Sequence, residues 1–321
     1  MSTRPDHSTL QQAAQWYARL AAAPDDARVR ERWAQWHAQS EVNRTAWSYV
    51  ERIGQRFQPL QADGDTALQT LRSARRAPPT RRQAMSGLAV LLGGALLGWG
   101  GWQNQRLRAG LLALRADLRS GTGEMREERL ADGTHIWLNG NSALDLDFRS
   151  DLRRLLLLQG EVLIETARDD RPFVVESGQG RMRALGTRFS VTQQDGATRL
   201  AVFDGAVEIR TADGTSRQVI EAGSQVRFDS AVIAAAQPAD PARQAWSKGI
   251  LAANDMPLAA FVEELSRYRH GHIGVDPALA DLRVMGSFPL HDSDRALAML
   301  QGALPVRIQR TLPWWVSIEP R

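Results

Sequence analysis

The sequence feature that most constrains the fold is a run without charged side chains, residues 83–105, between Arg82 and Arg106. A helix needs about 20 residues to cross the hydrocarbon core of a membrane, and a soluble core helix rarely stays uncharged on every face for that length. Trp99 and Trp102 lie near one end, where aromatic rings favour the membrane interface. The run therefore predicts a transmembrane helix over residues 84–102, extended by a juxtamembrane helix over 103–116.

Arginines around this run indicate its orientation. Four lie within ten residues before it and two lie just after it: Arg75, Arg76, Arg81, Arg82, Arg106 and Arg108. Positive side chains concentrate on the cytoplasmic side of a membrane, so the N-terminus is expected to be cytoplasmic. The pair Arg81 and Arg82 has two interpretations, a twin-arginine export signal or simple anchors of the helix end.

The segment before the run, residues 1–76, is predicted to be helical. Apolar residues recur at helical spacing from Leu10 to Leu20, from Val29 to Trp36 and from Ala46 to Phe57. Ser8 or Thr9 is the expected N-cap of the first helix. Leu68 and Leu71 predict a short fourth helix, and the two prolines in residues 77–83 mark a linker before the run.

Four of the ten tryptophans lie in this helical segment: Trp16, Trp33, Trp36 and Trp47. Roughly 70 residues is small for a self-sufficient core. These rings are therefore either core residues of the helices or anchors for a protein partner, a role that tryptophan often has.

From about residue 117 the pattern changes to an alternation of apolar and polar residues. Asp-Gly and Asn-Gly dipeptides, which suit tight hairpin turns, recur along this stretch at residues 132–133, 139–140, 195–196, 204–205 and 213–214. The spacing predicts an antiparallel all-β sandwich or barrel over residues 117–229. Residues 230–244 are expected to be a linker, and residues 245–321 predict an α+β domain of order βαββαβ with one further strand.

Composition and motifs exclude several chemistries. The chain has no cysteine, so disulfides and thiolate metal sites are absent. His270 and His272 lack a third ligand at suitable spacing, and no metal or cofactor is expected. No catalytic triad or paired carboxylates stand out, so an ordinary enzyme is not expected. The net charge is +4, but the arginines are interspersed with acids, so direct binding to nucleic acid does not follow.

Several motifs together resemble one family. "AAQWYARL" and "TAWSYVERI" lie in the helical segment, "RLADGTHIWLNGNSAL", "LLLLQGEVLIET" and "ALGTRFSV" in the β segment, and "WSKGILAANDMPLAAFVEELSRY" in the C-terminal segment. They are similar to the FecR family, the ferric-citrate-regulator type of transmembrane anti-sigma factor. The resemblance implies a multi-domain inner-membrane protein with a cytoplasmic helical domain, a periplasmic β domain and a periplasmic domain like the short N-terminal domain of secretins and TonB-dependent receptors.

The resemblance also implies a function and partners. The helical domain would bind an extracytoplasmic-function (ECF) sigma factor, with Trp16, Trp33, Trp36 and Trp47 at the contact. Residues 245–321 would receive the signalling domain of a ligand-loaded TonB-dependent outer-membrane receptor. Periplasmic and intramembrane proteases would then release the sigma factor to control iron or siderophore uptake genes.

A self-cleavage site is implied as well. Some relatives cut themselves at a Gly-Thr pair in the position of Gly186 and Thr187. A threonine hydroxyl can attack the preceding carbonyl when the turn is strained. The other interpretation is an ordinary tight turn in which Thr187 packs or forms hydrogen bonds.

Two other classes of protein compete with the sigma regulator. A membrane-anchored structural protein of the envelope or of a secretion system would suit the β and C-terminal segments, but it leaves the tryptophan-bearing helices without a role. A membrane-tethered hydrolase would need a catalytic site, and the sequence shows none.

Overall fold

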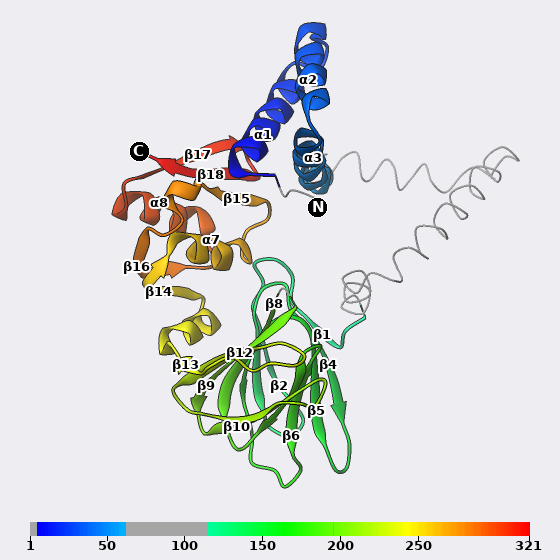
Figure 1. Cartoon of the computed structure of the whole chain (residues 1–321), viewed down its shortest axis with the longest axis vertical. Coiled ribbons are helices and arrows are strands. Elements are labelled where there is room, and N and C mark those ends of the chain that lie inside the picture. Colours follow the sequence, from blue (N-terminus) through cyan, green and yellow to red (C-terminus); the bar gives the residue numbers. More distant parts are fainter. Residues whose placement is uncertain (1–4, 62–114, 195) are drawn as a thin grey trace, which may run out of the picture. The chain divides into compact units, whose positions relative to one another are not determined.

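A computed structural model of the chain describes residues 5–61, 115–194 and 196–321 (Figure 1). These residues group into two compact units. The first contains the N-terminal helices and most of the C-terminal α+β region, and the second contains the β domain with the segment that follows it up to residue 254 and residues 285–293.

Three helices form the N-terminal region: α1 His7–Ala22, α2 Ala27–Gln39 and α3 Glu41–Gln61. The N-cap of α1 is Asp6, whose carboxylate accepts a hydrogen bond from the Thr9 backbone N–H at 2.8 Å. The helix thus begins slightly earlier than the expected cap at Ser8 or Thr9. Asp26 caps α2 in the same way, by accepting from the Arg28 and Val29 N–H groups.

The predicted fold class, a membrane protein with one transmembrane helix, is corrected by the structure. Among residues 5–61, 115–194 and 196–321, no helix is long and apolar enough to cross a membrane. The helices α1 to α3 are amphipathic. In α2, for example, the first two turns contain four charged residues, Arg28, Arg30, Glu31 and Arg32. The run over 84–102, the linker 77–83, the fourth helix and nearly all of 103–116 lie outside the described residues. The predicted inner-membrane location stays a prediction from the sequence.

The β domain is built from short strands joined mostly by tight turns. They are β1 Leu118–Arg119, β2 Arg126–Arg129, β3 His135–Leu138, β4 Ala143–Phe148, β5 Arg153–Glu165, β6 Phe173–Ser177, β7 Gly180–Ala184, β8 Arg188–Gln194, β9 Ala197–Asp204, β10 Ala206–Thr211, β11 Arg217–Glu221, β12 Ser224–Phe228 and β13 Gln237–Pro238.

The long strand β5 belongs to both halves of this sheet system. Its first half pairs with β4 and β6, and its second half pairs with β3 and β8. The strand changes partners at Gly160, which has φ +85°. A Cβ atom at this position would lie 2.6 Å from the Ser142 Cα and 2.8 Å from the Asn141 carbonyl oxygen. Glycine is therefore needed for both the backbone angle and the close approach.

The pairing of β5 with β6 is parallel, whereas the sequence predicted antiparallel strands throughout. Arg153 at the start of β5 lies opposite Phe173 at the start of β6, although only residues 166–172 connect the two strands. The chain after the end of β5 returns to the beginning of the strand, since Arg153 donates to the carbonyl oxygens of Ala167 and Arg171, and the change of direction at Gly160 accounts for the short connection.

One apolar core fills the domain. Its fully buried side chains come from strands of both halves and include Ile136, Leu155, Ile164, Phe189 and Ile209. Inward and outward residues alternate along β7 and β10, as the period of the sequence predicts.

The C-terminal region has the predicted order of elements. It contains β14 Ile250–Pro257, α7 Leu258–Ser266, β15 His272–Val275, the short 3₁₀ helix η2 Pro277–Leu279, β16 Arg283–Pro289, α8 Ser293–Ala303, β17 Val306–Leu312 and β18 Trp315–Pro320. The expected linker 230–244 contains β13 and the start of the 3₁₀ helix η1 Pro241–Lys248. Trp246 of η1 is buried and donates from its indole N–H to the Glu161 carboxylate of β5 at 3.1 Å.

The role of Gly160 predicts a large effect of a small substitution. Gly160→Ala should lower the free energy of unfolding of the β domain by at least about 2 kcal/mol, because the methyl group meets backbone atoms. Gly223→Ala is the matched control, since Gly223 has φ +80° but open space around its Cβ position; it should cost only about 1 kcal/mol. Urea unfolding followed by circular dichroism measures both, and equal losses would contradict this account of Gly160.

Candidate functional site

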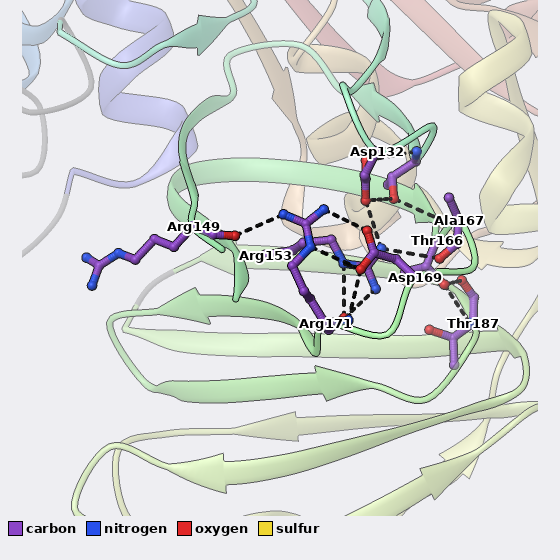
Figure 2. Close-up of polar contacts among 9 residues, drawn as sticks. Asp132, Arg149, Arg153, Thr166, Ala167, Asp169, Arg171 and Thr187 are labelled. Atoms are coloured by element: carbon purple, nitrogen blue, oxygen red, sulfur yellow. Dashed lines mark hydrogen bonds and ion pairs between the residues drawn. The ribbon is translucent and has the colours of Figure 1, made fainter. Parts of the chain in front are cut away.

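A buried arginine organises one end of the β domain. The Arg153 side chain is 4% exposed and donates to the Asp132 carboxylate at 2.8 Å (Figure 2). It also donates to the Ala167 carbonyl oxygen at 3.2 Å and to the Arg171 carbonyl oxygen at 2.7 and 3.1 Å. Arg153 thus ties the start of β5 to the segment that follows the end of β5.

Asp132, the ion-pair partner of Arg153, has a completely buried side chain. It also accepts hydrogen bonds from the Thr134 backbone N–H at 3.0 Å and from the Thr134 hydroxyl at 2.7 Å. Burial raises the pKa of Asp132, but the hydrogen bonds from Arg153 and Thr134 outweigh burial and hold the pKa below its ordinary value of 3.8. The carboxylate is therefore ionised at neutral pH and balances the buried guanidinium.

The same network fixes the connection between β5 and β6. The Ala167 backbone N–H donates to the Thr134 hydroxyl at 3.1 Å. Asp169 lies 4.0 Å from Arg153 and pairs with Arg171 at 2.6 Å. The hydrogen bond from Arg171 holds the pKa of Asp169 well below its usual range. The Arg153 network, defined as Arg153, Asp132, Thr134, Ala167, Asp169 and Arg171, thus holds the backbone of this connection on both sides.

The predicted cleavage pair, Gly186 and Thr187, lies in the turn before β8 and next to this network (Figure 2). Gly186 is exposed and has φ +77°, whereas Thr187 is buried. The Thr187 backbone N–H donates to the Thr166 hydroxyl at 2.9 Å. The Thr187 carbonyl oxygen accepts from the Thr166 backbone N–H at 3.1 Å and from the Thr166 hydroxyl at 3.2 Å.

The Thr187 hydroxyl is buried and has no hydrogen-bond partner within the part of the chain that the structure describes. Gly205, with φ +73°, packs closely against this turn. A Cβ atom on Gly205 would lie 2.4 Å from the Gly186 carbonyl oxygen and 2.8 Å from the Thr187 methyl group. The Gly186–Thr187 peptide is therefore held between Gly205 on one side and Thr166 on the other.

The chain contains four Gly-Thr pairs, and their environments differ. The hydroxyl of Thr122 donates to Asn141, that of Thr134 donates to Asp132, and that of Thr215 donates to Asp213. Among these four, only Thr187 combines burial with a hydroxyl that the described structure leaves without a partner. An unpaired buried hydroxyl costs free energy, and this distinguishes Thr187 from the threonines of the other three Gly-Thr pairs.

The four predicted tryptophans meet in one cluster of the N-terminal helices. The ring centroids of Trp16 and Trp36 are 6.5 Å apart, and those of Trp33 and Trp47 are 5.0 Å apart. Trp36 is buried and donates from its indole N–H to Gln12 at 3.1 Å. The other three rings are half-buried.

Arg81 and Arg82 lie outside the described residues. Within residues 245–321, no particular receptor-binding residues were predicted. Arg153 and Thr166 were not predicted as site residues. Arg153 shares the inward period of Leu155 and Leu157 along β5, and this alternation is the sequence signal that identifies it.

Comparisons with known families agree with this architecture. Residues 116–208 match the family described as FecR protein. Residues 11–53 match a domain of unknown function, DUF4880, which forms the N-terminal region of FecR-type proteins. The β domain therefore matches the FecR family model over most of its length, which confirms the resemblance of its motifs.

Two crystal structures of a candidate anti-sigma factor from Parabacteroides distasonis ATCC 8503, at 2.50 and 1.65 Å resolution, have a similar fold. Each aligns with a TM-score of 0.54 and 23% sequence identity, over 64% of this chain and 98% of the other chain. At this identity the similarity establishes a shared fold. No curated protein matches the sequence.

The buried ion pair predicts a specific loss of stability. Asp132→Asn should lower the free energy of unfolding by about 3 kcal/mol at neutral pH, because it leaves the Arg153 guanidinium buried without a counter-charge. Asp147→Asn is the control, since Asp147 pairs with Arg149 and Arg154 near the surface and should change stability little. Urea unfolding of the variants measures the difference.

The pH dependence of this loss follows from the lowered pKa of Asp132. Its contribution to stability is complete above the unfolded pKa of 3.8 and is lost as the pH falls through the lower folded pKa. The gap in unfolding free energy between the wild-type protein and Asp132→Asn should therefore narrow below about pH 4. A gap that stays constant down to about pH 2 would contradict the assignment.

Proposed function

We propose that this protein is a sigma-factor regulator of the anti-sigma type, in which helices α1 to α3 bind an ECF sigma factor. The match of residues 116–208 to the FecR family supports this proposal, as does the match of residues 11–53 to the N-terminal region of FecR-type proteins. The fold shared with a candidate anti-sigma factor is consistent with it.

The observation that carries the proposal is the tryptophan cluster of the three helices. The centre of the helical packing uses small residues, Ala13, Ala14 and Ala46, which are completely buried. The large rings of Trp16, Trp33 and Trp47 remain half-buried. Half-buried tryptophans of this kind are preferred anchors at protein interfaces, because a partner can remove a large apolar area from water.

The finer proposal concerns the signal. Residues 245–321 receive the signalling domain of a TonB-dependent receptor, and regulated proteolysis then frees the helices with their sigma factor to control genes for iron or siderophore uptake. The family resemblance supports this part.

Sigma-factor binding is tested with the full chain. We expect the tagged protein to co-purify with an ECF sigma factor from its native cells. Trp33→Ala should weaken the purified complex roughly 10-fold or more, as for an interface anchor. Trp137→Ala removes a half-buried tryptophan of the β domain and should leave the affinity unchanged. Recovery of no sigma factor, or equal affinity for both variants, would argue against the proposal.

A second proposal is self-cleavage between Gly186 and Thr187. The Thr187 hydroxyl attacks the Gly186 carbonyl carbon, the peptide C–N bond breaks, and an ester forms with a free Thr187 amine. Water then hydrolyses the ester to a Gly186 carboxylate and the original hydroxyl. The supporting observations are the buried Thr187 hydroxyl, which has no partner in the described structure, and its place directly after Gly186, an exposed glycine with φ +77°.

Expression of the intact chain tests this second proposal. The wild-type protein should yield two fragments, residues 1–186 and 187–321, and the downstream fragment should begin with Thr187. Thr187→Ala should remain uncut, because it lacks the nucleophile, whereas Thr187→Ser should still be cut. Thr215→Ala, at another Gly-Thr pair, is the control and should be cut like the wild type. Full-length wild-type protein alone would refute self-cleavage.

A further inference from the structure

Thr166 is the only side chain that the described structure places in hydrogen-bond contact with the nitrogen of the Gly186–Thr187 peptide. In an antiparallel pair of this kind, the N–H of Thr187 would normally donate to the carbonyl oxygen of the opposite residue. Here it donates to the Thr166 hydroxyl at 2.9 Å instead, while the Thr166 backbone N–H still donates to the Thr187 carbonyl oxygen at 3.1 Å. At the end of the pairing between β5 and β8, a side-chain hydroxyl thus replaces a backbone carbonyl oxygen as the hydrogen-bond acceptor.

This hydroxyl is held in place from both sides. Thr166 directly follows β5, where Glu165 pairs with Arg188. The next residue, Ala167, is fixed by Thr134 through its N–H and by Arg153 through its carbonyl oxygen. The Thr166 hydroxyl also donates to the Thr187 carbonyl oxygen at 3.2 Å. Its position against the peptide nitrogen is therefore set by the buried Arg153 network.

We propose that Thr166 is a catalytic residue of the self-cleavage. Its hydroxyl donates a proton to the Thr187 nitrogen as that nitrogen leaves the Gly186 carbonyl carbon. This inference rests on the proposed self-cleavage. An amide nitrogen is a poor leaving group until it is protonated, and positioned proton donors accelerate such steps.

The protons balance with water as the only other reactant. In the intact peptide, the nitrogen donates its hydrogen to Thr166. After the Thr187 oxygen attacks the Gly186 carbonyl carbon, the nitrogen gains a lone pair and the direction of this hydrogen bond reverses. The Thr166 hydroxyl gives its proton to the nitrogen as the C–N bond breaks, and water returns a proton to Thr166. Water also accepts the proton lost by the Thr187 hydroxyl, so the net change is an amide converted to an ester and an amine.

The test compares variants that differ only in the hydroxyl. Thr166→Val keeps the branched shape and removes the proton donor, and Thr166→Ser restores it. Thr192→Val is the matched control, because Thr192 is a buried threonine of β8 away from the turn. Each full chain is made by in vitro translation, and the uncut fraction is followed with time, with and without hydroxylamine, which cleaves the ester intermediate.

We expect Thr166→Val to slow ester formation roughly 100-fold, the usual effect of losing a general acid. Thr166→Ser should recover most of the rate, and Thr192→Val should match the wild type. Thr166→Ser and Thr192→Val should keep the wild-type unfolding midpoint within the error of the measurement. Thr166→Val removes the hydrogen bonds of Thr166 to the Thr187 backbone and should lower the midpoint slightly, but it should stay fully folded at the temperature of the cleavage assay.

The possible results distinguish a failure of the proposed role of Thr166 from a failure of the proposed self-cleavage. Wild-type protein that neither cleaves nor reacts with hydroxylamine overturns self-cleavage and the role of Thr166 together. Cleavage of Thr166→Val at the wild-type rate overturns only the role of Thr166. The role of Thr166 is also overturned if Thr166→Val and Thr166→Ser both cleave slowly and both have a lowered unfolding midpoint. The slow cleavage would then come from a damaged fold.

Discussion

The buried pair of Arg153 and Asp132 is the interaction on which the β domain depends. A guanidinium inside a protein is tolerated only when its N–H groups find acceptors and its charge finds a counter-charge. Arg153 meets this demand with one carboxylate and two carbonyl groups, all from segments outside β5. Those segments are the hairpin turn at Asp132 and the connection from β5 to β6, so one side chain fixes the closure of the domain at this end.

The hydrogen bonds of Arg153 also connect the β domain to the proposed cleavage site at Gly186 and Thr187. Gly160 lets β5 bend and serve both halves of the sheet system, and the bend brings residues 166–172 back to Arg153. Thr166 is the first residue of that connection, and it contacts both backbone polar groups of Thr187. A rigid support of this kind suits a reaction within a peptide bond, because attack on a carbonyl needs a fixed geometry more than it needs binding energy.

Much of this architecture could be predicted from the sequence, and the part that could not depends on contacts between distant residues. The alternation of apolar residues and the Asp-Gly turns predicted an all-β domain, and the structure has one, with strands from β1 to β13. The parallel pairing of β5 with β6 was missed, because a connection of seven residues normally joins antiparallel strands. Arg153 was overlooked, because a charged residue at the start of a strand usually points to solvent. The family resemblance selected Gly186 and Thr187 among the four Gly-Thr pairs, but the unpaired, buried hydroxyl of Thr187 could be recognised only in the folded structure.

The pairing of the strands also determines what a cut at Gly186–Thr187 would do to the domain. Before the cut site lie β5 and β7, and after it lie β8 and β10. Strand β8 pairs with β5 along six residue pairs, from Gly160 with Gln193 to Glu165 with Arg188, and β10 pairs with β7 along five. The apolar core contains residues from both sides, such as Leu155 and Phe189. A cleaved domain would therefore keep its two pieces together through the sheet and the core, and separating them would require force or unfolding.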